Sequence, residues 1–184
     1  LFKSNYRIFC SGGNLKNYAR MKTALEGRQV NSEIQRILNY IYLIQFPTAV
    51  VVDGDCWGGG LELLSCFDFV VATPHVFFGL WQRRNGRTTG WGGGERLQGR
   101  ISKSAFQLLA ISTNQINAYE AQAMGLVDEL AFNKFFAEKR ARQWLDSATK
   151  GPQQPIGSIK KMTNTNEAKL FEKHWWSQEH QAIL

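Results

Sequence analysis

Three consecutive glycines, Gly58 to Gly60, separate a run of β-branched residues from an apolar run that contains a carboxylate. The preceding segment, TAVVVDG, is typical of a short strand buried on both faces, and the following one, LELLSCFDF, predicts a short helix. Glycine is costly inside a helix and packs poorly inside a strand. Two explanations fit the triplet: the chain must approach another segment closely, or it must present backbone N–H groups to a ligand.

A second glycine turn precedes the triplet. Gly12 and Gly13 follow a strand-like segment at 6–10 and lead into a helical pattern at about 15–45, which ends before Pro47. A glycine turn at the start of a helix offers free N–H groups and the positive end of the helix dipole. Two such turns that converge are suited to bind an oxyanion, the charge that develops on a carbonyl oxygen.

The rest of the chain repeats the order of strand, glycine turn and helix. The segments FVVAT and HVFFG are strand-like, and the loop TTGWGGGERL is expected to open one helix that continues through SKSAFQLLAIS. NAYEAQAMGLVDEL and KFFAEKRARQWLDSAT predict two further helices, and the last third of the chain is expected to be helical. This order predicts an α/β fold with crossover connections.

Composition narrows the class of protein. A chain of 184 residues, 43% of them hydrophobic, is long enough for one domain with a sizeable core. No apolar run reaches the ~20 residues that a membrane-spanning helix needs. The net charge of +7 is compatible with nucleic acid, an anionic membrane surface or an anionic small molecule. Because the basic residues are dispersed and do not alternate with aromatic ones, nucleic acid is disfavoured.

The three cysteines, Cys10, Cys56 and Cys66, are odd in number and lie in apolar surroundings. They predict free thiols in a reducing compartment, taken here as the cytoplasm, and disfavour a disulfide framework. No CxxC or HxxxH spacing occurs, so no metal site is expected.

Four segments in the correct order resemble the enoyl-CoA hydratase/isomerase (crotonase) superfamily. RIFCSGGNLK is similar to its F-x-x-G-x-D/N-L segment, and FPTAVVVDGDCWGGGLELLSCFDFVVAT to its longer signature. FFGLWQRRNGRTTGWGGGERL and INAYEAQAMGLVDEL match the next two blocks. The arginine-rich loop and the tail HWWSQEH are most similar to the branch that contains ethylmalonyl-CoA decarboxylase.

The resemblance implies a crotonase-like spiral of ββα units at 1–115, followed by a helical region at 116–184 that mediates assembly into a homotrimer or hexamer. Members of the superfamily bind acyl-CoA thioesters and stabilise a thioester enolate with two backbone N–H groups, which correspond by position to Gly13 and Gly59. Coenzyme A is then part of the substrate, and no separate cofactor, metal ion or membrane is implied. Because the chain starts within a strand pattern, we expect the superfamily's N-terminal strands to be missing.

The superfamily's hydratases position and activate water with two glutamates. The first corresponds to Glu62, whose alternative role is to interact with the dipole of its own helix. The second corresponds to Gln82, and an amide cannot exchange a proton near neutral pH. Two-glutamate hydration is therefore in doubt, unless the loop aligns differently and Glu95 or Asp53 supplies a carboxylate.

Further substrate contacts follow from the same motifs. The residues expected to bind substrate are Gly12, Asn14, Leu15, Lys16, Gln82 and Trp91. Asn14 is also expected to cap the next helix, and Lys16 to contact a CoA phosphate. Asp68 is expected to serve the fold. Three arginines are candidates for CoA phosphates or a substrate carboxylate, with a solvated surface role as the alternative: Arg83, Arg84 and Arg87.

Three functions remain in competition. The leading one is a lyase or isomerase that makes an enolate of an acyl-CoA thioester, with Glu62 as acid/base, by hydration, double-bond isomerisation or decarboxylation. Decarboxylation of a malonyl-type thioester uses the same oxyanion hole but does not need two carboxylates to position water. The alternatives are a catalytically inactive subunit, which Gln82 supports, and an RNA-binding protein of the same fold.

Overall fold

The computed structural model describes residues 1–4 and 7–162. The strands in this part of the chain are β1 (Phe2–Lys3), β2 (Ile8–Cys10), β3 (Ala49–Val52), β4 (Asp55–Trp57), β5 (Phe69–Ala72), β6 (Phe77–Gly79), β7 (Ile116–Asn117) and β8 (Glu129–Leu130). The helices are α1 (Leu15–Ala19), α2 (Ala24–Leu43), α3 (Gly59–Leu64), α4 (Gly93–Arg100), α5 (Lys103–Gln107), α6 (Ala118–Ala123), α7 (Lys134–Ala148) and α8 (Gln154–Met162). A 3₁₀ turn at Gln82–Asn85 and a π-helical turn at Leu108–Ser112 complete the elements.

The strands form two four-stranded sheets, in the orders β1-β3-β5-β8 and β2-β4-β6-β7. All neighbours are parallel except β6 and β7, which are antiparallel. In the first sheet Val50 of β3 pairs with Phe2 on one side and Val70 on the other. All four residues of β3 are buried, as expected for a central parallel strand covered on both faces. The predicted α/β architecture with crossover connections is confirmed.

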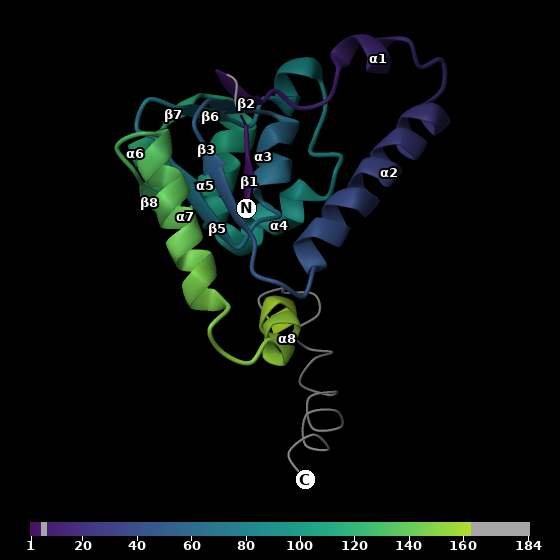
Figure 1. Ribbon diagram of the computed structural model, residues 1–184. Coiled ribbons are helices and arrows are strands. Elements are labelled where there is room, and N and C mark those ends of the chain that lie inside the picture. The colour runs from purple at the N-terminus through teal and green to yellow at the C-terminus, as the bar shows by residue number, and fades with distance from the viewer. Residues whose placement is uncertain (5–6, 163–184) are drawn as a thin grey trace.

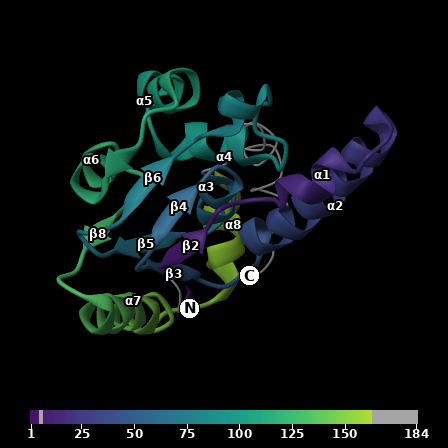
Figure 2. The same ribbon diagram turned by 90° about the horizontal axis from the view of Figure 1, so that it is seen from above.

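Helices cover the sheets from several sides. Helix α7 packs against β3 and β5, while α3 and α4 pack against each other on the other side of the sheets (Figure 1). Helix α2 extends along one flank of the molecule and stands apart from the strands (Figure 2). Leu38 is its one buried residue, and its C-terminal end approaches α8. Within the described ranges, no helix is both long and apolar enough to cross a membrane.

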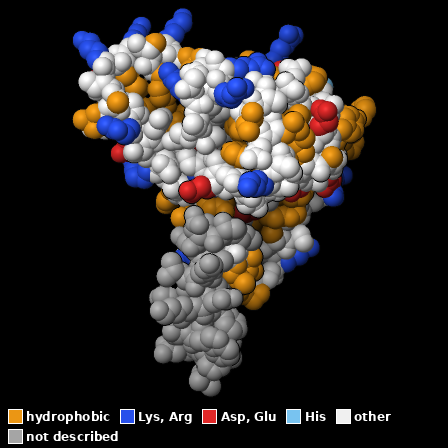
Figure 3. All heavy atoms as spheres, turned by 180° about the vertical axis from the view of Figure 1, so that it is seen from behind, with side chains coloured by type: hydrophobic (Ala, Val, Ile, Leu, Met, Phe, Trp, Pro, Cys, Tyr) orange, Lys and Arg blue, Asp and Glu red, His pale blue; other side chains and the backbone are white. Residues whose placement is uncertain are grey.

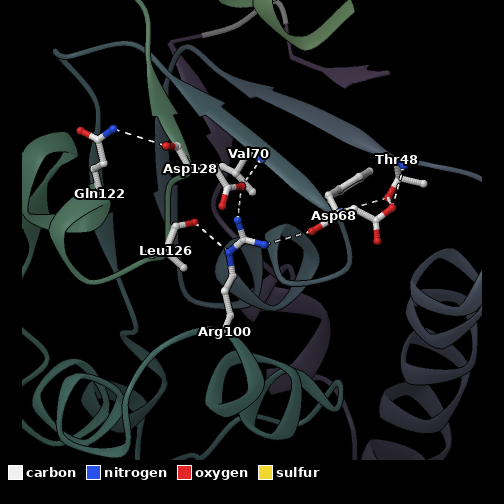
Figure 4. A network of polar contacts seen from close by, with 8 residues as sticks. Thr48, Asp68, Val70, Arg100, Gln122, Leu126 and Asp128 are labelled. Atoms are coloured by element: carbon white, nitrogen blue, oxygen red, sulfur yellow. Dashed lines mark hydrogen bonds and ion pairs between the residues drawn. The ribbon is translucent and has the colours of Figure 1, made fainter. Parts of the chain in front are cut away.

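Polar contacts connect the end of α4 to the segments that precede β5 and β8 (Figure 4). Arg100 donates to the carbonyl groups of Phe67 and Leu126 and forms an ion pair with Asp128. Asp128 in turn accepts a hydrogen bond from the N–H of Val70 at 2.7 Å. These contacts fix the end of α4 relative to the first sheet.

Asp68 has the structural role expected from the sequence. Its carboxylate accepts hydrogen bonds from the N–H and the hydroxyl of Thr48, both at 2.7 Å, and pairs with Lys160 at 2.9 Å. It thereby joins the segment before β5 to the segment before β3 and to α8.

The single helix expected from TTGWGGGERL through SKSAFQLLAIS is wrong. The chain leaves α4 at Ile101, which has an extended backbone, and restarts at Ser102. The Ser102 hydroxyl caps α5 by accepting a hydrogen bond from the N–H of Ala105 at 3.1 Å. A serine hydroxyl can bond to nearby backbone groups and so end one helix and begin the next. The apolar spacing continues across this break, which is why the sequence pattern did not show it.

The expected boundary at residue 116 falls within continuous sheets. β7 pairs with β6 and β8 pairs with β5, so the segment 116–130 adds one strand to each sheet. The helix expected at 117–130 is too long, because α6 ends at Ala123 and residues 129–130 form β8, whereas the helix expected at 134–149 corresponds to α7. The tryptophans and histidines of the last segment lie outside the described residues. Figure 3 shows the rear face, where Lys and Arg side chains gather along the upper edge and hydrophobic side chains are exposed in several places.

Candidate functional site

The two glycine turns and the loop before α4 surround a cavity of about 180 Å³. Six of the residues predicted to form the site line this cavity: Gly13, Leu15, Gly59, Glu62, Gln82 and Trp91. They come from segments that are distant in the sequence and that the two sheets bring together. A larger cavity, of about 400 Å³, lies between α4, α7 and α8, but none of the predicted site residues lines it.

The other three predicted residues contribute indirectly or stand apart. Gly12 has φ of +86°, and a Cβ at this position would lie 2.7 Å from the Gly59 nitrogen. Asn14 caps α1 as predicted, by accepting a hydrogen bond from the N–H of Lys16 at 3.0 Å. Lys16, which was expected to contact a CoA phosphate, is exposed and does not line the cavity.

Close packing accounts for several of the glycines. A Cβ on Gly60 would lie 2.3 Å from the Cys10 carbonyl oxygen, and a Cβ on Gly59 would lie 2.3 Å from the Trp91 ring. A Cβ on Gly13 would lie 2.7 Å from the Tyr18 ring. The first explanation of the triplet, close approach of another segment, is therefore confirmed.

The backbone N–H groups of the glycines differ in their partners. Gly58 donates to the carbonyl of Gly79 at 2.8 Å, which holds the start of α3 against β6. For the N–H groups of Gly13 and Gly59, both residues of the cavity wall, no acceptor is present among the described residues. These two N–H groups are candidate donors to a ligand oxygen.

Glu62 lies on α3 and is 2% exposed. Its carboxylate accepts four hydrogen bonds: from the Gln82 amide at 3.0 Å and from the N–H groups of Gly90 at 3.4 Å, Trp91 at 2.8 Å and Gly93 at 3.0 Å. A carboxylate has about four acceptor positions, so each is occupied. Since Gly93 is the first residue of α4, the positive end of the α4 dipole also faces this carboxylate. Glu62 thus anchors the loop at 90–93.

Arg96 also binds the loop at 90–93. The sequence did not predict this residue as part of the site. This buried side chain donates to the carbonyl of Trp91 at 2.8 Å, the hydroxyl of Ser65 at 3.1 Å and the Asn39 side chain at 2.8 Å. Its contacts are made across α2, α3 and α4. No local motif marks such a residue, because its partners are defined by tertiary packing alone.

Aromatic side chains form another part of the wall. The Trp57 and Trp81 rings stack with their centroids 4.0 Å apart. On the opposite side, the Trp91 indole N–H lies 3.1 Å from the Tyr18 hydroxyl and 3.2 Å from the Asn31 side-chain oxygen. The sequence indicated Trp91 but missed Tyr18 and Asn31, which belong to α1 and α2 and lie outside the glycine motifs.

Gln82 lies next to Glu62, as expected for the position that corresponds to the second glutamate of the hydratases. Its Nε2 donates to the carboxylate, so its Oε1 must point away from Glu62. That oxygen is buried and has no hydrogen-bond partner among the described residues. A buried acceptor without a partner is costly, which makes this atom a candidate contact for a bound molecule.

Neither alternative carboxylate reaches the cavity. Glu95 is exposed on the first turn of α4, and Asp53 lies 3.7 Å from His75. Glu62 is the one carboxylate on the cavity wall among the described residues. The same part of the chain holds no cluster of three or more His, Cys, Asp or Glu side chains that fits a metal ion.

The three cysteines are free thiols, as predicted. Burial is the main cause that raises the pKa of Cys66 from 9.0 to about 11. Burial also raises the pKa of Cys56 well above its ordinary value, with a smaller contribution from neighbouring Cys10. Neither buried thiol is suited to nucleophilic chemistry, since the thiolate is the reactive form.

Comparison with known proteins decides the family. The sequence profile of the enoyl-CoA hydratase/isomerase family matches residues 2–181. The chain belongs to the enoyl-CoA hydratase/isomerase family. The resemblance found in the sequence motifs is thereby confirmed at the level of the superfamily.

Two groups of relatives are similar to this member of the family. Mitochondrial methylglutaconyl-CoA hydratase of Homo sapiens is 33% identical over 150 residues, which cover 81% of this chain and 44% of the relative. Ethylmalonyl-CoA decarboxylase of Danio rerio is 30% identical over 158 residues, which cover 84% of this chain and 52% of the relative. The chain thus spans about half the length of these relatives.

Solved structures of the family have the same fold. An enoyl-CoA hydratase from Shewanella pealeana superposes with a TM-score of 0.86 over 99% of this chain and 69% of that chain, at 17% identity. An enoyl-CoA hydratase from Thermoplasma volcanium superposes with a TM-score of 0.77 over 98% of this chain and 75% of that chain, at 25% identity. The predicted crotonase-like fold is therefore confirmed.

Proposed function

We propose that the protein forms the enolate of an acyl-CoA thioester by decarboxylating a malonyl-type acyl group. The N–H groups of Gly13 and Gly59 bind the thioester oxygen. The bond between Cα and the carboxylate carbon breaks, and its electron pair is delocalised onto this oxygen while CO₂ leaves. Solvent water then protonates Cα and leaves hydroxide. The two donors act where negative charge develops, which is an effective form of transition-state stabilisation.

One observation carries the choice of decarboxylation. Glu62, the single carboxylate on the described cavity wall, has its acceptor positions occupied by Gln82 and the loop at 90–93. Activation of water needs a base that is free to accept a proton. Loss of CO₂ generates the enolate without removing a proton, so it is compatible with a fully engaged carboxylate. The similarity to ethylmalonyl-CoA decarboxylase supports the same reaction.

Hydration or double-bond isomerisation is the second candidate. It is favoured by the similarity to methylglutaconyl-CoA hydratase and by the position of Glu62 on the cavity wall. In this reaction Glu62 would exchange one of its four hydrogen bonds for contact with the substrate and would act as acid and base. The partner of the protein is an acyl-CoA in either case.

Incubation of the protein with ethylmalonyl-CoA, crotonyl-CoA and a 3-enoyl-CoA, with products identified by mass, tests the proposal. We expect CO₂ and butyryl-CoA from ethylmalonyl-CoA, with slow conversion of the other two thioesters. Rapid hydration of crotonyl-CoA without release of CO₂ from ethylmalonyl-CoA would favour the second candidate. If none of the three thioesters reacts, the catalytically inactive alternative is supported.

A further inference from the structure

The three arginines between β6 and α4 are not equivalent. Arg83 donates to the carbonyl of Ile111 at 2.6 Å. Arg84 donates to the hydroxyl and the carbonyl of Thr113 at 3.3 and 2.5 Å, and its guanidinium stacks on Trp81 at 4.2 Å. Both side chains therefore fasten the 3₁₀ turn to the π-helical turn and its end.

Arg87 differs from both of them because it lies on the wall of the candidate site. Its guanidinium carbon lies 4.8 Å from the centre of the Tyr18 ring. Arg87 also borders two further cavities, and the residue is exposed. In the described ranges, no ion pair is formed by this side chain.

Tyr18 places this cation next to the proposed thioester position. The ring lies so close to Gly13 that a Cβ there would be 2.7 Å from Tyr18 Cε2. The Tyr18 hydroxyl donates to Asn31 at 2.7 Å and accepts from the Trp91 indole at 3.1 Å, which fixes the ring. One immobilised ring therefore touches the backbone of Gly13 and carries the guanidinium on its face.

No carboxylate on the described wall of the site neutralises the charge of Arg87. Glu62 is the one carboxylate on the described wall, and its oxygens are directed at Gln82 and at the backbone of the loop at 90–93. A guanidinium matches a carboxylate with two parallel N–H donors, and stacking on an aromatic ring leaves those donors free. The site is therefore complementary to a ligand that brings an anion of its own.

We propose that Arg87 selects acyl-CoA thioesters whose acyl group carries a second carboxylate. This inference rests on the proposed function, because it assumes that the thioester lies at Gly13 and Gly59. A CoA phosphate has the same charge and could reach the same cation. The two sources of the anion are distinguished by thioesters that differ only in the acyl carboxylate.

Initial binding of ethylmalonyl-CoA and butyryl-CoA, measured before turnover by stopped-flow fluorescence of the tryptophans on the cavity wall, is the test. The two compounds differ by one carboxylate and share all the phosphates. We expect the protein to bind ethylmalonyl-CoA about 10- to 100-fold more tightly, the usual range for a hydrogen-bonded charge pair. Arg87→Gln should abolish this preference and leave the affinity for butyryl-CoA unchanged. Glutaryl-CoA, with its carboxylate farther from the thioester, tests whether the position of the acid matters.

Two control variants complete the design. Lys103→Gln removes the same charge from the exposed start of α5 and should retain the preference. Arg87→Lys keeps the charge without the two-pronged geometry and should retain only part of it. If Arg87→Gln weakens both thioesters equally, the guanidinium binds a CoA phosphate and the proposal is overturned. An equal affinity of the unmodified protein for both thioesters overturns it as well.

Turnover separates this proposal from the proposed function. If ethylmalonyl-CoA is decarboxylated, Arg87→Gln should raise its KM without lowering kcat, because a contact that is no stronger in the transition state than in the ground state does not contribute to kcat. If the protein prefers the dicarboxylic thioester through Arg87 but releases no CO₂, the assignment of decarboxylation fails and the selectivity of Arg87 stands. If the protein releases CO₂ but Arg87→Gln changes neither binding nor KM, decarboxylation stands and the proposed selectivity of Arg87 fails.

Discussion

At the scale of single residues, two different roles can be assigned to Glu62. Its place in the motif predicts an acid/base, whereas its contacts make it the anchor of the loop that carries Trp91. Hydrogen bonds to a charged group contribute about 1.5–3 kcal/mol each, so these contacts dominate the local energetics. The anchoring role and the catalytic role make different predictions for the same substitution.

Replacement of Glu62 by Gln should lower turnover by about 10²–10⁴-fold if the carboxylate exchanges a proton with the substrate. The anchoring role predicts, in addition, a loss of stability, because an amide NH₂ would replace one acceptor oxygen and face N–H donors. Thermal unfolding and kinetics of the same variant separate the two roles. A large loss of activity with an unchanged Tm would contradict the anchoring role.

A carboxylate at position 82 should increase hydration. Gln82→Glu introduces the second glutamate that hydratases of the family use, at a position where the present side chain is 3.0 Å from Glu62. At that separation the two carboxyl groups would share a proton, and one of them could then serve as an acid. We expect faster hydration of crotonyl-CoA, measured by loss of absorbance, with Gln82→Asn as the control. An unchanged rate would show that the missing glutamate does not limit hydration.

Cys66 makes the stability depend on pH in the alkaline range. Its pKa rises from 9.0 to about 11 on folding, so the fold favours the neutral thiol. This contribution is fully present below the pKa of the unfolded thiol and is lost as the pH rises through about 11. The free energy of unfolding of the unmodified protein should therefore fall more steeply between pH 9 and 11 than that of Cys66→Ala. Parallel pH profiles from denaturant titrations would refute this.

At the scale of helices and strands, the sequence predicted those elements whose position is determined by a local residue pattern. The β-branched run of β3 and the amphipathic period of α7 were sufficient to place both elements. The break between α4 and α5 was missed because Ser102 interrupts the backbone without interrupting the apolar period. The motifs predicted six of the residues on the cavity wall, including Leu15 at the start of α1, but they carried no information on Tyr18 of α1 or Asn31 of α2. Arg87 was one of three equivalent candidates until tertiary packing distinguished it.

Arg96 should be the residue on which the packing of α4 depends most. Its guanidinium connects α4 to Ser65 of the α3 segment and to Asn39 of α2. A lysine at this position keeps the charge but cannot donate in three fixed directions. From the ~1.5–3 kcal/mol of a hydrogen bond to a charged group, we expect Arg96→Lys to cost about 2–4 kcal/mol of unfolding free energy. Arg36→Lys, in the exposed ion pair with Glu33, should change it by less than ~0.5 kcal/mol.

At the scale of the whole molecule, several aromatic side chains near α6 and the start of α7 are strongly exposed. Tyr119 is 62% exposed, Phe132 84% and Phe135 72%. Single exposed apolar side chains are ordinary in monomers, whereas a surface used for assembly gathers several of them. They lie in the region, 116–184, that the family resemblance assigns to assembly of a homotrimer or hexamer. That assembly remains a prediction.

We expect the protein to sediment as a trimer or hexamer at micromolar concentration, and Phe132→Asp combined with Phe135→Asp to shift it toward the monomer. Each substitution would place a charge in a buried interface, where an unpaired ion is strongly unfavourable. In a monomeric protein the same residues face water, so the double variant should leave both sedimentation and Tm nearly unchanged. Substitution of Lys139 on α7 by Asp serves as the control for the added negative charge. A monomer for the unmodified protein, with no dependence on concentration, would exclude this surface as the site of assembly.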